Sequence, residues 1–396
     1  MMGRSKLIKN WPMRGLNYFR REWTAKRREA AREEAREEAN PRRRRDSEVP
    51  LRYIHIGYPK AASTALQKGF FAWHSHLCHL GCGTVCDKGY WDDHGYIDSA
   101  VNVALEVDLR YRNEYSYVPE QTAAAFEPHF QEAREDPFAH AVGISNENLC
   151  FNWHGGIDTP TKARRLFEIF GPGTRIVAVV RNQRDLIASL YKESIRFGYD
   201  GSFAEYLEYI WTYQDRNFFH DFCSDRVLGT YASLFGRENV VALPFEALKE
   251  DSGLFVKDLC KAIGVDHHEA RMDENYNPQL SGRSLTVKRD LNRQFRHTFG
   301  RGVYTPCDTH RFVPYLTQMS GGTLGIEHHT DYWVRQELCR AAEKIAERAA
   351  SAEELRIEWD GEFAERLLGA YAAANERLVE FVDRADLARF GYLPLG

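Results

Sequence analysis

The chain has 396 residues, of which 43% are hydrophobic and 28% charged. A chain of this length and composition can bury one large core or two smaller ones, which excludes collagen-like, fibrous and wholly disordered proteins. Its uncharged apolar runs, such as residues 176–180, are far shorter than the roughly 20 residues that a membrane-spanning helix needs. The composition therefore predicts a soluble protein.

The N-terminus and the cysteines indicate a cytoplasmic protein. Arg4, Lys6, Lys9 and Arg14 interrupt every apolar window in which a secretory signal would lie. The eight cysteines are too sparse for a disulfide framework in a chain of this length. We therefore expect reduced thiols and a cytoplasmic location.

Positive charge is concentrated at the N-terminus. Residues 1–45 hold fifteen Lys or Arg and six Glu, a net charge of +9, which leaves −13 for residues 46–396 given the total of −4. Opposite charges three and four residues apart predict a solvated helix over 27–39, and four consecutive arginines at 42–45 predict a flexible linker. The predicted organisation is a basic tail over 1–50 and a single catalytic domain over 51–396.

Two interpretations of this tail stay open. The tail is either a solvated segment without a partner, or a basic amphipathic segment over residues 1–45. In the second case it lies on an anionic membrane surface at the inner face, or on the acidic body of a second copy. No recognition motif for nucleic acid follows it, so we expect no nucleic-acid partner.

Strands and helices alternate from Leu51 onward. Short β-branched runs at 53–57, 141–145, 175–180 and 239–243 are each followed by helical periodicity. This alternation predicts an α/β fold with a mostly parallel central sheet flanked by helices. Helical patterns at 332–350 and 362–387 predict a helical C-terminal portion.

The first strand-to-helix junction has the composition of an anion-binding loop. The strand ends at Gly57, Lys60 lies in the turn, and four small residues open the helix: Ala61, Ala62, Ser63 and Thr64. Small side chains let an anion approach the free N–H groups of a first helical turn, where the helix dipole also favours negative charge. The helix is expected to bury Leu66, Phe70, Trp73 and Leu77. The loop lacks the Gly-Lys-Ser/Thr of a Walker A motif.

A second junction carries a matching group of side chains. Arg181 follows the strand at 175–180, Asn182 is the expected helix N-cap, and Ser189 lies about two helical turns further on. Arg181 and Ser189 are expected to converge on one phosphate, because ligands of parallel sheets bind at the carboxyl ends of the strands.

These residues resemble the sulfotransferases that use 3′-phosphoadenosine-5′-phosphosulfate. The loop of that family that binds the 5′-phosphosulfate reads roughly Pro-Lys-x-Gly-Thr-Thr-x-Leu, and here residues 59–66 read Pro-Lys-Ala-Ala-Ser-Thr-Ala-Leu. The family's 3′-phosphate motif has an Arg, a Ser eight residues later and often a Tyr two beyond, which match Arg181, Ser189 and Tyr191. Weaker similarity continues at 240–248, 277–292 and 375–392.

Two departures from the family pattern affect the expected geometry. Ala62 replaces the usual Gly, which is tolerable if its φ stays negative. Gln183 replaces the usual Pro, which is expected to loosen the turn after Arg181.

The resemblance implies a role for each matched residue. Lys60 neutralises charge on the departing phosphate, and Ser63, Thr64 and the N–H groups of Ala61 and Ala62 hold the 5′ side. Arg181 and Ser189 bind the 3′-phosphate, and no metal is expected because a sulfuryl group carries less charge than a phosphoryl group. Transfer is expected to be in line and loose, so that catalysis is mostly positioning.

The general base is a choice among several residues. Glu147 follows a predicted core strand at its carboxyl end and is similar to a glutamate segment of the family. Glu147 as an ordinary helix-start glutamate is the alternative, and His140 and His154 are further candidates.

A cluster of His and Cys has residue types that zinc accepts as ligands. It comprises His74, His76, Cys78, His79, Cys82 and Cys86, with the three cysteines at four-residue steps on one possible helix face. Structural zinc sites pair such ligands with a second pair at a distance, which is absent, so we expect no metal.

The acceptor is the least determined part of the function. Aromatic residues over 90–117 and the aperiodic segment 299–331 suit a glycan or glycolipid hydroxyl, although an amine acceptor and buried tyrosines remain alternatives. Two other classes stay open: an ATP-dependent kinase on the same general fold, and a non-catalytic docking protein that uses its basic tail.

Overall fold

The computed structural model describes residues 43–45, 48–81, 97–151, 156–268, 270, 280–294, 327–348 and 353–394. Predictions made for the tail at 1–42, for Cys82, Cys86 and His154, and for most of the segment 299–331 lie outside these residues. None of the described helices is both long enough and apolar enough to cross a lipid bilayer.

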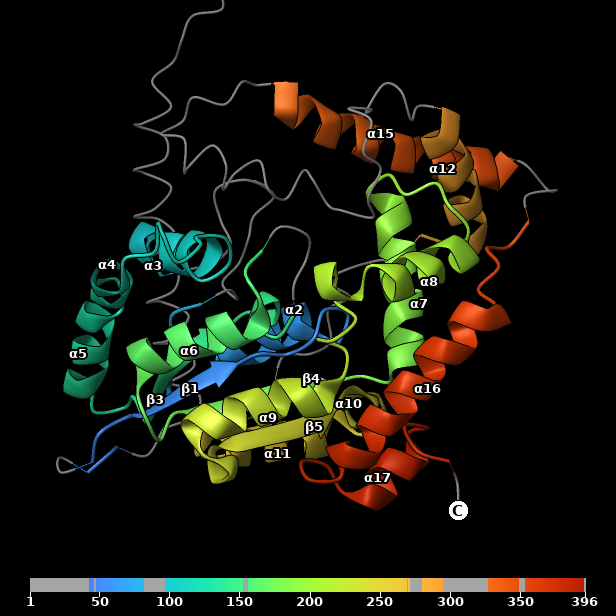
Figure 1. Ribbon diagram of the computed structural model, residues 1–396. Coiled ribbons are helices and arrows are strands. Elements are labelled where there is room, and N and C mark those ends of the chain that lie inside the picture. Colours follow the sequence, from blue (N-terminus) through green and yellow to red (C-terminus); the bar gives the residue numbers. More distant parts are fainter. Residues whose placement is uncertain are drawn as a thin grey trace, which may run out of the picture.

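A parallel sheet organises the described part of the chain (Figure 1). Its five strands lie in the order β2-β3-β1-β4-β5, with the bounds β1 Leu51–His55, β2 Leu77–His79, β3 Ala141–Ser145, β4 Arg175–Val180 and β5 Val240–Pro244. Every pair is parallel, and Ile54 of β1 lies opposite Ile144 on one side and Ile176 on the other. The predicted α/β fold is confirmed, and continuous burial of β3 fits a sheet covered on both faces.

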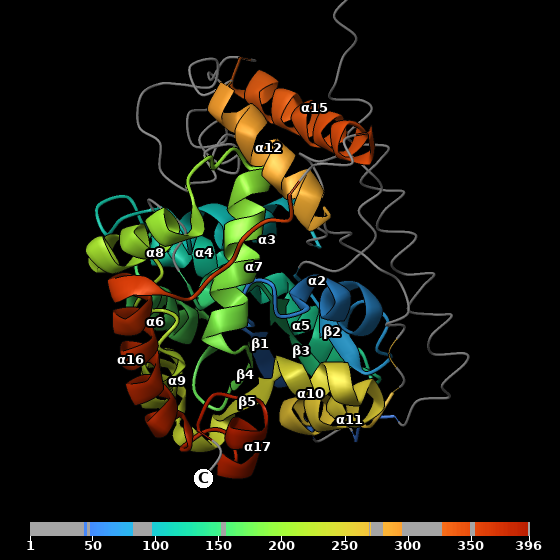
Figure 2. The same cartoon turned by 90° about the vertical axis from the view of Figure 1, so that its right-hand side faces the viewer.

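Helices cover the two faces of this sheet. Figure 2 shows α9 and α11 on opposite sides of β4 and β5. Along the chain the helices are α2 Ser63–Leu66, α3 Ser99–Val103, α4 Pro119–Ala124, α5 Glu127–Glu135, α6 Thr159–Phe170, α7 Gln183–Arg196, α8 Phe203–Thr212, α9 Ser224–Phe235, α10 Phe245–Glu250, α11 Ser252–Ile263, α12 Gly282–Gln294, α15 Glu327–Arg348, α16 Gly361–Leu378 and α17 Arg384–Arg389. Short π-helical turns at Gln67–Phe71 and Ala104–Asp108 continue α2 and α3.

The first predicted helix is shorter than its periodicity indicated. Leu66 and Phe70 are buried as expected, but the helix ends at Phe71, and Leu77 and Cys78 lie in the edge strand β2. Cys78 pairs with Val142 of β3, which rules out the shared helix face considered for the cysteines.

Arg44, which lies in the segment expected to be a flexible linker, packs on the body instead. Its side chain is buried and donates to the carbonyls of Ala139 at 2.9 Å and Arg134 at 2.7 Å. Its backbone N–H donates to Pro137 O at 2.7 Å. Residues 43–45 are therefore tied to the end of α5.

The predicted C-terminal helices are present as α15, α16 and α17. The second pattern, expected as one helix over 362–387, is divided because α16 ends at Leu378 and α17 begins at Arg384, where Asp383 caps the new helix through Ala385 N. In Figure 1, α16 and α17 lie beside α9 and α10, so the end of the chain packs against the central body.

Candidate active site

The carboxyl ends of three strands lie side by side. β1 is flanked by β3 and β4, and Asn146 N after β3 donates to His55 O at 3.0 Å. Beyond β1 the chain continues to pair with β4, because Ile56 N donates to Val177 O at 2.8 Å. The segments that follow these strands therefore meet at one edge of the sheet, where parallel α/β proteins bind their ligands.

The loop between β1 and α2 adopts a conformation that the sequence did not predict. Lys60 has φ 59° and Ala62 has φ 62°, both in the left-handed region. The condition under which Ala62 would be tolerated without strain, a negative φ, is therefore not met. The left-handed region brings Cβ too close to the following carbonyl oxygen, which costs roughly 1–2 kcal/mol for a residue other than Gly.

Replacing Ala62 by Gly is expected to stabilise the protein. Gly removes the clash at φ 62° but adds freedom to the unfolded chain, so we expect the free energy of unfolding to rise by about 0.5–1 kcal/mol. Denaturant unfolding measures the change. The matched control is Ala65→Gly within α2, where the same substitution should lower stability by a similar amount. Equal effects of the two variants would contradict the assigned conformation.

The same loop presents a row of backbone donors. Ala61 N donates to Tyr58 O at 3.3 Å, and the buried Ser63 hydroxyl donates to the same carbonyl at 3.1 Å. The N–H groups of Lys60, Ala62, Ser63 and Thr64 donate to none of the described residues. These N–H groups lie at the start of nine continuous helical residues, 63–71, so they can receive an anion.

Lys60 is paired with a buried carboxylate that the sequence analysis missed. Its Nζ lies 3.4 Å from Oε2 of Glu193 on α7, and Arg196 Nη1 lies 3.0 Å from the same oxygen. Glu193 is four residues after Ser189, so both lie on the helix face toward the loop. No local pattern reveals the contact of Glu193 with Lys60, because the two residues are 133 positions apart in the chain.

Arg181 joins the two predicted motifs. Its Nη1 donates to the carbonyl oxygen of Lys60, and its guanidinium carbon lies 4.8 Å from the ring centre of Phe245. Burial lowers the pKa of Arg181, although a guanidinium stays protonated at any pH of interest. Among the described residues Nε and Nη2 have no hydrogen-bond partner, so one edge of the fork is available to an anion.

The turn after Arg181 is anchored rather than loosened. Asn182 accepts from Arg184 N at 3.0 Å as the predicted N-cap, and its side-chain amide donates to Gly391 O at 2.8 Å. Gln183 is buried and donates to Asn375 Oδ1 at 2.9 Å. The expectation that Gln183 loosens the turn is wrong, because its amide makes contacts with α16 that a proline could not make.

Glu147 lies at the same edge of the sheet. It is half-buried at the start of the 3₁₀ turn Glu147–Leu149, directly after β3, and Asn146 caps this turn through Asn148 N at 2.9 Å. The thiol of Cys150 lies 3.5 Å from Gly57 O, which ties the turn to the loop between β1 and α2. The position of Glu147 is therefore compatible with both predicted roles, as the general base and as an ordinary residue at the start of a helical turn.

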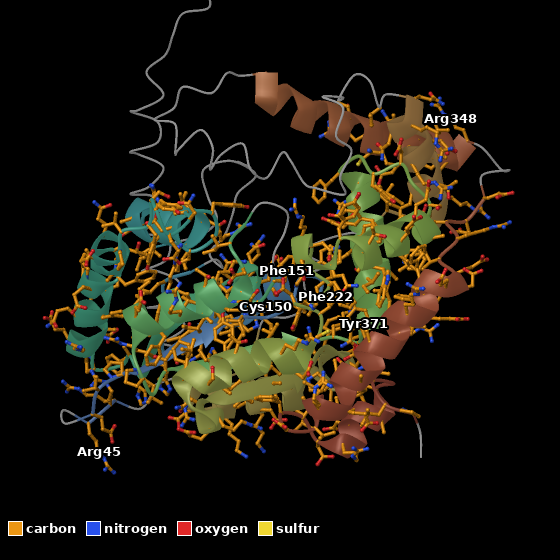
Figure 3. All side chains as sticks on the ribbon, viewed as in Figure 1. Arg45, Cys150, Phe151, Phe222, Arg348 and Tyr371 are labelled. Atoms are coloured by element: carbon orange, nitrogen blue, oxygen red, sulfur yellow. The ribbon has the colours of Figure 1, made fainter. Side chains whose placement is uncertain are left out.

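Buried side chains hold the turn from behind. The ammonium of Lys162 on α6 donates to Asn148 O at 2.9 Å and to Phe151 O at 2.8 Å. Burial lowers the pKa of Lys162 to about 8. Cys150 and Phe151 lie beside Phe222 in the interior (Figure 3), and the rings of Phe151 and Phe222 are 6.4 Å apart.

The histidines considered at the sequence level lie elsewhere. His140 precedes β3 and stacks on His76 at 4.1 Å, so it occupies the amino edge of the sheet, opposite Glu147. His74 is also buried near this edge, and its Nε2 donates to the backbone carbonyl oxygen of Asp266 at 3.1 Å. Within the described ranges, no group of three or more His, Cys, Asp or Glu is arranged to hold a metal ion.

A buried histidine lies beneath the loop. His55 ends β1, and its Nδ1 lies 2.7 Å from Ser145 Oγ, which also accepts from Gln67 at 3.1 Å. Its Nε2 is buried and has no partner among the described residues. A Cβ on Gly57 would lie 2.6 Å from this nitrogen, so Gly57 is required for the loop to pass over the ring.

We expect these buried histidines to make the protein sensitive to acid. Burial lowers the pKa of His55 to about 3, and burial with the nearby His268 lowers that of His74 to about 3. Both rings gain protons on unfolding below about pH 6.5, so the stability they contribute is present above that pH and is lost as the pH falls toward 3. The free energy of unfolding should fall by up to roughly 1.4 kcal/mol per pH unit for each histidine.

Denaturant unfolding from pH 7 to pH 4 tests this dependence. His55→Asn keeps a polar atom near Ser145 but cannot titrate, so its slope against pH should be smaller than that of the unsubstituted protein. Identical slopes would show that His55 does not contribute.

One protein-family model matches the part of the chain that carries the second phosphate motif. Residues 162–294 match the family model described as "Sulfotransferase domain". This segment is about a third of the chain, and it includes Arg181, Ser189 and Glu193 but not the loop at 59–66. The predicted resemblance to sulfotransferases is thus confirmed over this segment.

Solved sulfotransferase structures match this chain with low sequence identity and low TM-scores. A sulfotransferase from Alicyclobacillus acidocaldarius has 18% identity and a TM-score of 0.40, covering 70% of this chain and 98% of that chain. The sulfotransferase domain from the curacin biosynthetic pathway has 11% identity and a TM-score of 0.34, covering 82% and 97%. Mouse sulfotransferase SULT7A1 complexed with PAP has 12% identity and a TM-score of 0.27, covering 77% and 90%. These scores are too low to support any inference about activity, and no curated protein matches the chain.

Proposed function

We propose that the protein transfers a sulfuryl group from 3′-phosphoadenosine-5′-phosphosulfate to an acceptor hydroxyl. The observation that carries this proposal is the hydrogen bond from Arg181 to the backbone of Lys60, which brings the two phosphate motifs into one site. The N–H groups at 60 and 62–64, which have no partner among the described residues, suit the 5′-phosphosulfate. The edge of Arg181 that is likewise unpaired within the described ranges suits a 3′-phosphate. The anionic sulfate donor is thus bound by a few hydrogen-bond donors of the site, although residues 46–396 carry a net charge of −13.

The reaction follows from these positions. The acceptor oxygen attacks the sulfur in line, the new S–O bond forms, and the bond from sulfur to the 5′-phosphate oxygen breaks. Lys60 neutralises the charge that grows on this phosphate oxygen. Glu147 takes the acceptor proton in our proposal, because it lies at the same edge on a turn that Lys162 holds in place. Adenosine 3′,5′-bisphosphate is released.

Nucleotide binding tests the donor assignment. Isothermal titration should show adenosine 3′,5′-bisphosphate binding at least tenfold more tightly than adenosine 5′-phosphate, and without added magnesium. Equal affinities would overturn the roles of Arg181 and Ser189. A requirement for magnesium together with turnover of ATP would favour a kinase instead.

We further propose a glycan or glycolipid hydroxyl as the acceptor. Aromatic side chains between residues 90 and 117 motivate this choice, and the phenol ring of Tyr115 is fully exposed at the end of that segment. Mass spectrometry of a glycan panel incubated with the sulfate donor should show a gain of one sulfate on some members. Sulfation of amines only, or of phenols only, would contradict this choice without affecting the donor assignment.

A further inference from the structure

A pocket opens at the amino edge of the sheet, on the side opposite Lys60 and Arg181. Its volume is about 420 Å³, within the range of sites for small ligands. It lies where β1, β3 and β4 begin, between the segment 49–52, α5 and the loop 171–174. Arg45, labelled in Figure 3, marks this end of the molecule.

Arg52 is held in a fixed position on one wall of this pocket. Its guanidinium carbon lies 4.1 Å from the ring centre of Phe130, and its Nη1 donates to Phe170 O at 2.7 Å. A guanidinium has five N–H groups, and among the described residues only those on Nη1 have partners. The remaining groups are available to a ligand that enters the pocket.

A second guanidinium lines the same pocket. Arg134, near the end of α5, is exposed and makes no ion pair with any described residue. Its carbonyl accepts from Arg44 at 2.7 Å, which fixes this end of the helix. Burial and the charge of Arg134 both lower the pKa of Arg52, whereas Glu127 opposes this effect from beyond ion-pair distance.

The rest of the lining is mostly apolar, and its one polar side chain, Thr174, donates to the carbonyls of Phe170 and Gly171. Phe130, Val142 and Phe170 are buried lining residues, as is Pro50, whereas Pro172 is exposed. Two cations that repel one another are stabilised by an anion placed between them, and the apolar wall favours a ligand with a hydrocarbon body.

We propose that this pocket binds a small amphipathic anion, namely a single carboxylate or sulfate group on a short apolar chain. The anionic group lies between Arg52 and Arg134, and the apolar chain lies on Phe130 and Phe170. The pocket is separate from the donor site, so the proposal does not depend on the proposed function.

Calorimetric titration with four probes tests this assignment. Octanoate and octyl sulfate each combine charge with a chain, octanol has the chain alone, and inorganic sulfate has the charge alone. We expect octanoate or octyl sulfate to bind with one-to-one stoichiometry and at least tenfold more tightly than octanol and inorganic sulfate. The stronger of the two identifies the preferred head group. Octanol binding as tightly as octanoate, or inorganic sulfate as tightly as octyl sulfate, would overturn the proposal.

Two variants place the binding in this pocket. Arg134→Gln should lower the affinity for octanoate or octyl sulfate about tenfold, which corresponds to about 1.4 kcal/mol. Arg134→Glu should lower this affinity further. Both variants should fold, since the side chain of Arg134 has no partner in the described structure. The matched control is Arg384→Gln on α17, an arginine that is also exposed. Unchanged affinity in both Arg134 variants, or an equal loss in the control, would refute the site.

Discussion

Replacing Lys60 by Met is expected to lower the turnover number by 10² to 10³, equivalent to about 3–4 kcal/mol of transition-state stabilisation. The ammonium lies in the loop that faces the 5′-phosphosulfate in the proposed reaction, and only the departing phosphate oxygen gains charge during transfer. The effect should therefore appear in kcat more than in donor affinity. Steady-state assays of sulfate transfer measure both.

Lys257→Met on α11 is the matched control for this prediction. Lys257 is exposed and far along the chain from the loop, so the turnover number of the Lys257→Met protein should be unchanged. Thermal unfolding should show that the Lys60 variant is still folded. A folded Lys60→Met protein with kcat within threefold of the unsubstituted protein would remove Lys60 from the mechanism.

Replacing Arg181 by Met is expected to abolish selectivity for the 3′-phosphate. Met keeps an apolar contact with Phe245 but removes the fork, and two charge-assisted hydrogen bonds contribute about 3 kcal/mol together. Affinity for adenosine 3′,5′-bisphosphate should fall about 100-fold, while affinity for adenosine 5′-phosphate should change little. Titration with both nucleotides gives the ratio directly.

Arg184→Met is the control for Arg181. Arg184 is exposed in the first turn of the same helix, so loss of its general positive charge should affect both nucleotides equally and weakly. If Arg181→Met weakened both nucleotides by the same factor, Arg181 would contribute to the loop structure and not to recognition of the 3′-phosphate.

Most of the sheet could be predicted because four of its strands are short apolar runs with turn or helix-start residues after them. The runs at 141–145 and 175–180 contain β-branched residues and have a polar residue directly before and after them. Both are strands with the predicted bounds. Strand β2 escaped prediction because it has three residues, Leu77–His79, and pairs with β3 alone. Its residues also fit the end of a helical period.

The site was predictable where residue type alone carries the chemistry. A lysine among small residues after a strand, and an arginine after another strand, indicate anion binding whatever their exact geometry. The φ angle of Ala62 was not predictable, because alanine normally avoids the left-handed region. The contact of Glu193 with Lys60 and that of Gln183 with Asn375 join residues more than 130 positions apart, which a local pattern cannot reveal.

The anchoring of Asn182 has a consequence for the synthesis of the protein. The chain separates Asn182 from its partner Gly391 by 209 residues. At about 5–20 residues per second, Gly391 is added roughly 10–40 s after Asn182. The sheet strands that position Lys60 can pair during this interval, but the turn that carries Arg181 gains its contact with Gly391 only after that residue has been added. Nascent chains should therefore bind a 5′-phosphate group before they can distinguish a nucleotide that also carries a 3′-phosphate.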